Sequence, residues 1–260
     1  MLPLESLKDM RPYFATPCYA MQTASVYSMS MFLMGFECGK RGVEAWLEHR
    51  SESALTWSRN AIVARFRANT SYTHLVWWDA DVMAGPEQVF RLLLADKDIA
   101  AGVPPIKQFN WPKDGVPAGT SLDEFVARSS TYPFFPTELS TDDDGFAKVV
   151  YVPTGLMCIK RSVFDKLEAA YQHLNYIPNG AANPGPKSGL YWNFYDNMID
   201  PISRHPLTED FRFCRLWIDL GGEIWADTTS QLGHLGQHLW LGNLGEKLYG
   251  QEARQIQEAA

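Results

Sequence analysis

The sequence predicts an α/β protein in which a mostly parallel central sheet is flanked by helices. Segments typical of strands alternate with segments typical of helices over residues 13–103, an order characteristic of a parallel sheet covered by helices. One of these strands, LVWW at residues 75–78, is apolar throughout and leads directly to two acidic residues. Hydrophobic residues make up 46% of the 260-residue chain, which is ample for the core of one large domain over residues 1–260.

Residues 13–20 and 43–49 predict the first two strands, which a helix connects. The apolar residues of that helix recur at steps of three and four, as on one helical face: Val26, Met29, Leu33 and Phe36. Gly39 can close the helix, because glycine readily adopts the left-handed conformation that follows many last turns.

The next segments continue the alternation of strand and helix. Residues 53–68 predict a second helix and residues 73–78 a third strand. A third helix is expected to begin at Gly85-Pro86 and to run to Leu94, since proline is favoured in the first turn of a helix. Residues 98–103 predict the fourth strand.

The middle of the chain is less regular. Residues 104–145 carry several prolines and aromatic residues and predict loops with at most a small hairpin. Within them, Asp142-Asp143-Asp144 predicts a solvated turn, with a metal site as the less favoured alternative. Strand character resumes over residues 147–159, and Ser162 is expected to cap a short helix that ends at Ala170.

Residues 176–197 predict a long loop that is rich in asparagine, glycine, proline and aromatic residues. Such a loop is either a functional lid or an ordered surface loop held by its aromatic residues, and the sequence leaves both interpretations open. Thr208 can cap the helix that follows, and Gly221-Gly222 can end it. The apolar stripe of that helix is expected to be Phe211, Cys214, Trp217 and Ile218. Short strands at 223–226 and 231–234 and a helical tail complete the prediction.

Charge and cysteine content exclude several classes of protein. The net charge of −7 and the pI of about 5.4 argue against a nucleic-acid binder with a broad basic face. The four cysteines form no CxxC motif, so we expect buried free thiols in a reducing compartment. The opening MLPLESLKDM has no apolar core typical of a signal peptide, and the apolar runs are far shorter than a membrane span. We therefore expect a soluble cytoplasmic protein, with peripheral membrane association as an alternative.

The two acidic residues after the apolar strand are the strongest chemical signal in the sequence. Asp79 and Asp81 are two residues apart, so both side chains point the same way if the strand continues past Trp78. Ligands of open α/β sheets bind beyond the carboxyl ends of the strands, where two carboxylates could hold a divalent cation such as Mg²⁺ or Mn²⁺. In the alternative reading, Asp79 caps a turn and Asp81 is only solvated.

Four segments together resemble one enzyme family. WSRNAIVARF followed by TSYTHLVWWDADV resembles the nucleotide-sugar-binding half of a GT-A-fold glycosyltransferase with its DxD motif. VPTGLMCIKRSVF resembles the family's segment beside the donor sugar, TEDFRFCRLWIDLGGEIWAD its acidic pair near the acceptor, and LGHLGQH its metal-binding histidine segment. The resemblance covers residues 10–240 and implies a Rossmann-like GT-A fold, with a nucleotide-binding half near 10–110 and an acceptor-side catalytic half near 145–240.

The resemblance implies a metal-dependent glycosyltransferase. Its donor would be a nucleoside-diphosphate sugar, UDP- or GDP-linked, and its acceptor a hydroxyl of a glycan or small molecule. By this resemblance, Asp81 and His234 bind Mn²⁺ or Mg²⁺, and Asp79 contacts the donor ribose or the metal through water. Imidazole nitrogen favours Mn²⁺ of these two ions. His238 is the rival ligand, and a histidine that merely packs between leucines is the alternative for His234.

The resemblance also places donor-binding residues at the strand ends: Thr16, Pro17, Tyr19, Arg59, Lys107 and Gly155. Tyr19 could stack on the base or belong to the core, and Arg59 could contact the diphosphate or lie on the surface. Gly155 has no Cβ and would let the donor sugar approach the backbone, although a glycine at a β-bulge is equally compatible with its position.

Asp210 is the expected general base, with Glu209 as the alternative. Direct displacement at the anomeric carbon needs a carboxylate that takes the acceptor's hydroxyl proton, so this pair favours inversion. The helix start stabilises both carboxylates in any case, and that purely structural role is the alternative interpretation. On the acceptor side, Tyr191, Trp192 and Asn193 are suited to a lid over a sugar.

Two other functions fit a similar fold. A nucleotidyltransferase that makes nucleotide-sugars would require a glycine-rich, basic loop after the first strand, and ATPCYAMQTAS has neither glycine nor a basic residue. A non-catalytic nucleotide- or sugar-binding module is the second alternative, and only measured turnover separates it from an enzyme.

Overall fold

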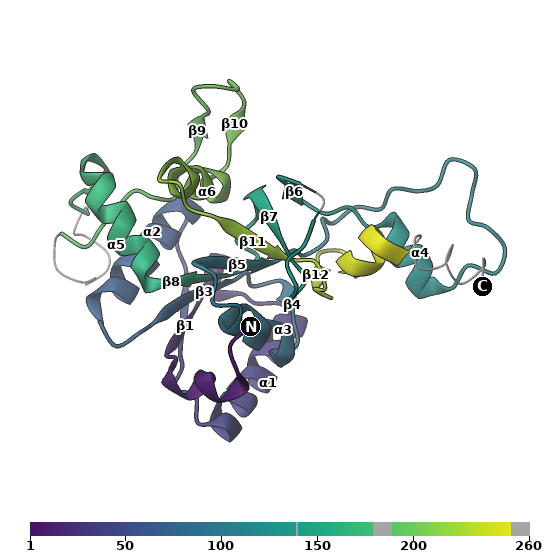
Figure 1. Ribbon diagram of the computed structural model, residues 1–260, viewed down its shortest axis with the longest axis horizontal. Helices are drawn as coiled ribbons and strands as arrows, with labels where there is room; N and C mark the ends of the chain where they lie inside the picture. Colours follow the sequence, from purple (N-terminus) through teal and green to yellow (C-terminus); the bar gives the residue numbers. More distant parts are fainter. Residues whose placement is uncertain (139, 179–188, 251–260) are drawn as a thin grey trace.

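An eight-stranded sheet forms the centre of the computed structural model, which describes residues 1–138, 140–178 and 189–250 (Figure 1). Its strands in spatial order are β2 (Trp46–Arg50), β1 (Pro12–Pro17), β3 (His74–Trp78), β8 (Leu156–Lys160), β5 (Ile99–Gly102), β11 (Ile224–Asp227), β7 (Phe146–Tyr151) and β6 (Phe135–Pro136). The predicted strands are therefore present.

The sheet is mixed, which corrects the expectation of a plain β-α-β succession. β1 pairs in parallel with β2 and β3, and β11 pairs in parallel with β5. β8 lies antiparallel between β3 and β5, and β7 lies antiparallel between β11 and β6. Six strands thus run in one direction and two in the other. The residues 147–159, predicted as one strand region, form both reversed strands.

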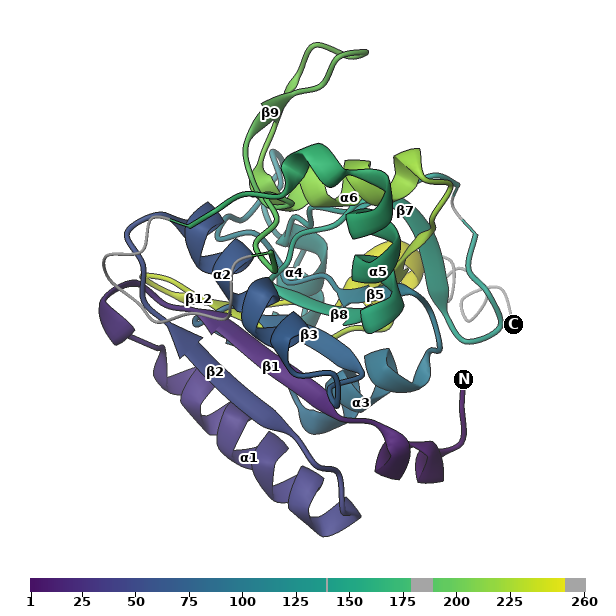
Figure 2. The same ribbon diagram turned by 90° about the vertical axis from the view of Figure 1, so that its left-hand side faces the viewer.

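Helices cover both faces of this sheet (Figure 2). One face packs against α1 (Ser25–Arg41) and α3 (Pro86–Leu94), and the other against α2 (Leu55–Ala68), α5 (Arg161–Ala170) and α6 (Glu209–Asp219).

β3 shows how the strands separate two hydrophobic layers. Leu75 and Trp77 belong to the layer under α2, α5 and α6, whereas Val76 and Trp78 belong to the layer under α1 and α3. All four side chains are 0% exposed, as expected for a strand that is buried on both faces.

Helix α1 was predicted correctly, but its apolar stripe faces solvent. Met29, Leu33 and Phe36 are exposed, and Tyr27 and Met34 are buried instead. The sheet provides polar partners for the inward face, since the Tyr27 hydroxyl hydrogen-bonds with that of Thr16 at 2.7 Å. The helix also continues beyond Gly39 and ends at Gly42, whose φ of 69° is left-handed.

Two further local expectations were wrong. Residues 104–145 contain a helix, α4 (Leu122–Ser129), and Ser121 caps it by accepting a hydrogen bond from the Glu124 N–H at 3.2 Å. Ser162 does not cap α5, because that helix already begins at Arg161 with Lys160 in the capping position.

Smaller elements surround the main sheet. A second sheet joins β4 (Val82–Met83), β12 (Gly233–Leu235) and β13 (Leu239–Leu241), and the ribbon formed by β9 (Met198–Ile199) and β10 (Pro206–Leu207) projects from the body in Figure 1. Short 3₁₀ turns are η1 (Leu4–Asp9), η2 (Tyr19–Met21) and η3 (Gln172–Leu174). Residues 244–250 are helical as predicted, and the end of that tail, like residues 179–188 of the predicted long loop, lies outside the described residues.

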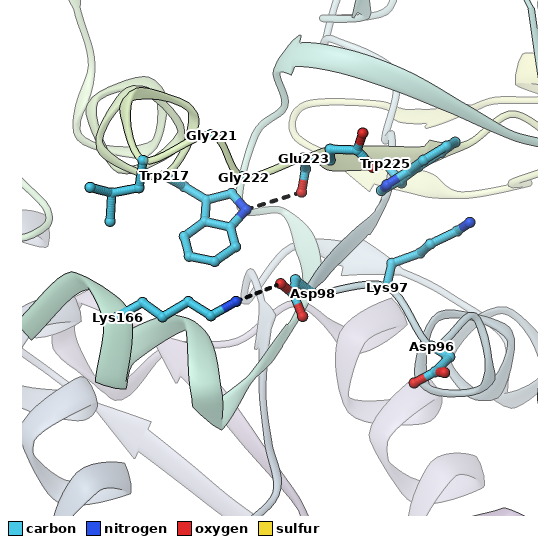
Figure 3. A pocket seen from close by; sticks show the side chains of 10 residues that line it. Asp96, Lys97, Asp98, Lys166, Trp217, Gly221, Gly222, Glu223 and Trp225 are labelled. Atoms are coloured by element: carbon cyan, nitrogen blue, oxygen red, sulfur yellow. Dashed lines mark hydrogen bonds and ion pairs between the residues drawn. The ribbon is translucent and has the colours of Figure 1, made fainter.

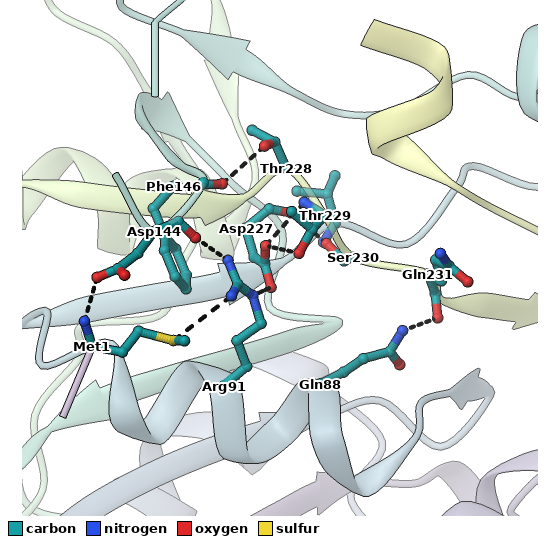
Figure 4. Close-up of polar contacts among 12 residues, drawn as sticks. Met1, Gln88, Arg91, Asp144, Phe146, Asp227, Thr228, Thr229, Ser230 and Gln231 are labelled. Carbon is teal, nitrogen blue, oxygen red and sulfur yellow. Dashed lines mark hydrogen bonds and ion pairs between the residues drawn. The ribbon is translucent and has the colours of Figure 1, made fainter. Parts of the chain in front are cut away.

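Arg91 of α3 connects this helix to strands β11 and β7 of the main sheet (Figure 4). Its Nε lies 2.7 Å from Oδ2 of Asp227, which is 1% exposed, and its guanidinium lies 4.9 Å from the ring centroid of Phe146. Asp142, in the acidic run, accepts hydrogen bonds from the N–H groups of Asp144 and Phe146, which confirms the turn.

The prediction of buried free thiols is confirmed for all four cysteines: Cys18, Cys38, Cys158 and Cys214. Among the described residues, no helix is both long and apolar enough to span a bilayer.

Candidate functional site

The chain turns sharply at the end of β3, and this turn shapes the site. The Asp79 N–H donates to the Gly155 carbonyl at 3.0 Å, and the Val82 N–H donates back to the Asp79 carbonyl at 3.1 Å. The strand geometry therefore does not persist, and Asp79 and Asp81 bind different partners. Asp79 contacts residues of α2, whereas Asp81 contacts β12 and the segment after β5.

Asp81 lies between a lysine and a histidine. β12 pairs with β4 so that His234 is opposite Val82, and this register brings His234 Nε2 to 3.4 Å from Asp81 Oδ1. Lys107 Nζ lies 2.6 Å from the other oxygen, Oδ2. Burial acts to raise the pKa of Asp81, but the hydrogen bonds and charges of His234 and Lys107 outweigh it, and the pKa is lowered.

A backbone carbonyl orients the imidazole of His234. Nδ1 lies 2.9 Å from the Pro105 carbonyl oxygen, which can only accept, so the neutral ring carries its proton on Nδ1. In the neutral ring the lone pair of Nε2 points at the Asp81 side, as it does in histidines that bind metals, whereas in the protonated ring Nε2–H donates to Asp81 Oδ1. His238 is elsewhere, with its ring 5.2 Å from that of Trp240. Of the two candidate histidines, the structure brings His234 to Asp81.

Arg59 joins the second aspartate to the catalytic candidates. Its Nη2 lies 3.0 Å from Asp79 Oδ1 and its Nε lies 3.4 Å from Glu209 Oε1, and the side chain is only 2% exposed. The guanidinium also lies 5.0 Å from the centroid of the Trp77 ring. Burial raises the pKa of Asp79 and Glu209, and Arg59 opposes the rise in both. Arg59, which the resemblance places at the donor diphosphate with a surface position as the alternative, is thus a buried bridge between two carboxylates.

Asp210 is adjacent to this bridge at the start of α6. Its Oδ1 accepts hydrogen bonds from the Thr208 hydroxyl and from the Phe211 N–H. Its charge contributes to the raised pKa of Asp79 and of Glu209, so the three carboxylates share one neighbourhood. Arg59 engages Glu209, whereas Asp210 is held by the Thr208 hydroxyl and the Phe211 N–H.

The other predicted donor residues lie near the ends of β1 and β8. Thr16 is fully buried and bonded to Tyr27, whereas Tyr19 is 77% exposed. Pro17 ends β1 and is half-buried. A methyl group at Gly155 would lie 2.9 Å from Cγ of Pro104, so this glycine permits close packing of the chain on itself beside Asp79.

The predicted acceptor residues separate into two environments. Trp192 lies in the hydrophobic core, with its ring parallel to that of Phe194 at 5.8 Å. Asn193 accepts a hydrogen bond from the Asn60 side chain at 3.0 Å. Tyr191 and Asn193, with Trp57 and other residues, line a cavity of about 440 Å³ beside α2.

The side chains around Asp81 include two that suit a divalent cation. Among the described residues, no group of three or more His, Cys, Asp or Glu side chains is arranged to hold a metal. Asp81 and His234 nevertheless supply one oxygen and one imidazole nitrogen 3.4 Å apart. Mn²⁺ and Mg²⁺ commonly take few protein ligands and fill the shell with water and substrate phosphates, so this pair fits such an ion. Asp79 is not part of the pair.

Sequence reasoning missed several supporting residues. Tyr195 accepts a hydrogen bond from Trp77 Nε1 at 2.7 Å beneath Arg59, and Pro105 orients His234 through its carbonyl. The aromatic residues around Tyr195 are a signal that the sequence shows. The role of the Pro105 carbonyl leaves no signal in the sequence, because every residue has a backbone carbonyl.

A second cavity, of about 350 Å³, is lined by Asp98, Trp217 and Glu223 among other residues (Figure 3). Asp98 and Glu223, which line it, precede β5 and β11, so it lies at the amino ends of the strands. Because ligands of α/β sheets bind beyond the carboxyl ends, this cavity is not the candidate site.

The fold and the site together define an α/β protein with an acidic, histidine-bearing site at the carboxyl ends of its strands. No protein-family model and no curated protein matches the chain. A197 from STIV aligns over 90% of this chain and 95% of its own, with 14% identity and a TM-score of 0.45.

Glycosyltransferases are among the other structures that match. GalNAc-T7, solved with UDP, GalNAc and Mn²⁺, aligns over 87% of this chain and 43% of its own, with 13% identity and a TM-score of 0.42. A glycosyltransferase involved in the glycosylation of the major capsid of PBCV-1 aligns over 64% and 68%, with 10% identity and a TM-score of 0.34. At such low sequence identities and TM-scores, these matches carry no argument about the function of this chain.

Proposed function

We propose that the protein is a metal-dependent glycosyltransferase that uses a nucleoside-diphosphate sugar. The observation that supports this most is the Asp81–His234 pair, in which Nε2 faces Oδ1 at 3.4 Å beyond the carboxyl end of β3. Asp81 lies on the same turn as Asp79, which Arg59 connects to Glu209 at the start of α6. A cation-and-diphosphate site is thereby joined to a candidate base.

Asp81 and His234 would hold Mn²⁺ or Mg²⁺, which would offset the charge that develops on a departing diphosphate. Lys107 would add a second positive charge on the same side. Pro17 and the exposed Tyr19 would border the base at the end of β1, next to the buried Thr16, and Asp79 would face the ribose. These roles come from the family resemblance, and the position of Asp81 and Asp79 directly after the carboxyl end of β3 supports them.

Asp210 would take the proton of the acceptor hydroxyl as that oxygen attacks the anomeric carbon. The Thr208 hydroxyl and the Phe211 N–H hold one carboxylate oxygen, and among the described contacts the other is left to face a ligand. Glu209 would position Arg59 instead of acting as the base. Because a single displacement with one base inverts the anomeric centre, we propose an inverting reaction.

Calorimetry with UDP and GDP tests the metal and nucleotide site of this proposal, and measured turnover then separates an enzyme from a binding module. We expect one of the two nucleotides to bind the wild-type protein in the presence of Mn²⁺ and to lose most of its affinity in EDTA. Asp81→Ala and His234→Ala should abolish the Mn²⁺-dependent binding, while Asp143→Ala, which removes an exposed carboxylate far along the chain, should leave it unchanged. Binding that is equal in EDTA and in the Asp81 variant would refute the metal site.

A further inference from the structure

Lys107 reaches Asp81 through a shaped slot. A methyl group at Gly236 would lie 3.0 Å from Lys107 Cδ and 3.1 Å from Trp240 Cζ3. Because Gly236 has no side chain, the aliphatic part of Lys107 packs against its backbone, next to the Trp240 ring. At the end of the slot, Nζ lies 2.6 Å from Asp81 Oδ2. This slot directs the ammonium group onto the aspartate.

The backbone around Lys107 is held while its side chain remains partly solvated. The Ile106 N–H donates to the Thr131 carbonyl at 2.8 Å, and the Pro105 carbonyl accepts from His234. The Lys107 side chain is 35% exposed and that of Asp81 is 38% exposed. The ammonium group can therefore leave the carboxylate by rotation of its own side chain, without a rearrangement of the loop.

A lysine and a divalent cation compete for this carboxylate. Lys107 occupies Oδ2, and His234 faces Oδ1, so a cation that binds at the Asp81–His234 pair meets a positive charge already in place. Like charges at such short range repel, and a partly exposed ion pair is weak enough to be displaced. Once displaced, the ammonium group is still at the site and lacks a counter-ion.

We propose that Lys107 is a movable cation that occupies Asp81 in the free protein and transfers to the phosphates of the donor when a divalent cation takes Asp81. This inference rests on the proposed function, because it requires a diphosphate ligand. It assigns two opposite effects to one side chain: Lys107 weakens the binding of the cation alone and strengthens the binding of the diphosphate with the cation.

Two titrations of the full chain separate these effects. Free Mn²⁺ is followed by electron paramagnetic resonance up to millimolar concentration without nucleotide, and UDP or GDP is titrated by calorimetry at saturating Mn²⁺. The variants are Lys107→Met, Lys107→Arg, which keeps the charge, and Lys113→Met, which makes the same change at an exposed lysine further along the loop.

Lys107→Met should bind Mn²⁺ alone up to about tenfold more tightly than the wild type, and bind the nucleotide about tenfold more weakly. Lys107→Arg should restore much of both values, and Lys113→Met should match the wild type. General damage to the site would weaken both affinities together. The inference would be overturned if Lys107→Met bound Mn²⁺ no more tightly than the wild type. The absence of Mn²⁺ binding by both proteins counts as that outcome.

The nucleotide titration of the wild type separates the two proposals. If neither UDP nor GDP binds the wild type with Mn²⁺, the proposed function and the transfer of Lys107 to phosphate both fail. If the nucleotide binds the wild type and Lys107→Met equally well, the proposed function stands and this inference fails.

Discussion

Replacing Arg59 by methionine should destabilise the fold as well as the site. The guanidinium is 2% exposed and lies within 3.0 Å of Asp79 and 3.4 Å of Glu209. Methionine fills much of the same volume but offers neither charge nor hydrogen bonds. Asp79 and Glu209 would therefore remain close to each other without their common cation.

The size of the effect follows from the burial of the three groups. Removing one partner of a buried ion pair costs roughly 3–5 kcal/mol, because the other charge stays buried and unpaired. Asp79 is 33% exposed and can be hydrated, whereas Glu209 is 14% exposed and has less access to water. We therefore expect a loss of about 3 kcal/mol in the free energy of unfolding, which lowers Tm by roughly 6–12 °C in a chain of this size.

Urea denaturation at two pH values tests the electrostatic cause. Burial already raises the pKa of Asp79 and Glu209, and without Arg59 their pKa values rise further, so the folded variant holds more protons than the unfolded chain. The unfolding free energy of the variant must then fall as pH rises above the unfolded values of about 4. The defect should be larger at pH 7 than at pH 5.

An exposed ion pair provides the control. Arg11 lies 3.0 Å from Glu44, with 48% and 76% of the two side chains exposed, so Arg11→Met should cost less than about 1 kcal/mol. A loss in Arg59→Met as small as in Arg11→Met, or equal losses at pH 5 and pH 7, would refute the buried bridge.

Other substitutions test the division of roles at the site. Asp210→Asn should lower kcat by roughly 10²–10⁴-fold with little change in nucleotide affinity, whereas Glu209→Gln should retain most of kcat, as initial rates would show. Gly155→Ala should cost about 1–3 kcal/mol in urea denaturation, because the new methyl group would lie 2.9 Å from Pro104 Cγ. Burial raises the pKa of Cys158 to about 12, so a thiol reagent should modify it at pH 8 only after unfolding.

The sequence predicted the helices and strands better than the pairing of the strands and the packing of the helices. The hydrophobic pattern located β3 and α6 well, because this signal is local. Thr208 does stand immediately before α6, but its side chain makes no capping hydrogen bond and donates to Asp210 instead. The pattern did not indicate that β8 would lie antiparallel between β3 and β5, since strand pairing depends on contacts distant in sequence. The wrong prediction for α1 has the same cause. Helical spacing identifies an apolar face, but the contacts with the sheet determine which face of the helix is buried.

At the site, residue types were predictable and their contacts were not. The spacing of Asp79 and Asp81 suggested one shared ligand, yet the Val82-to-Asp79 hydrogen bond turns the chain and separates their partners. The choice of His234 over His238 depends on the register between β12 and β4, which no local pattern encodes.

The charges at the site give a physical reason for a divalent ion. Four carboxylates, on Asp79, Asp81, Glu209 and Asp210, face two cationic side chains, those of Arg59 and Lys107. When ionised, the four carboxylates exceed the two cationic side chains by two negative charges, and a diphosphate would add more. One divalent cation at Asp81 and His234 would cancel that excess, and release of Lys107 would move a further positive charge toward the phosphates. A monovalent cation would leave the site negative, so we expect Na⁺ or K⁺ to support nucleotide binding poorly.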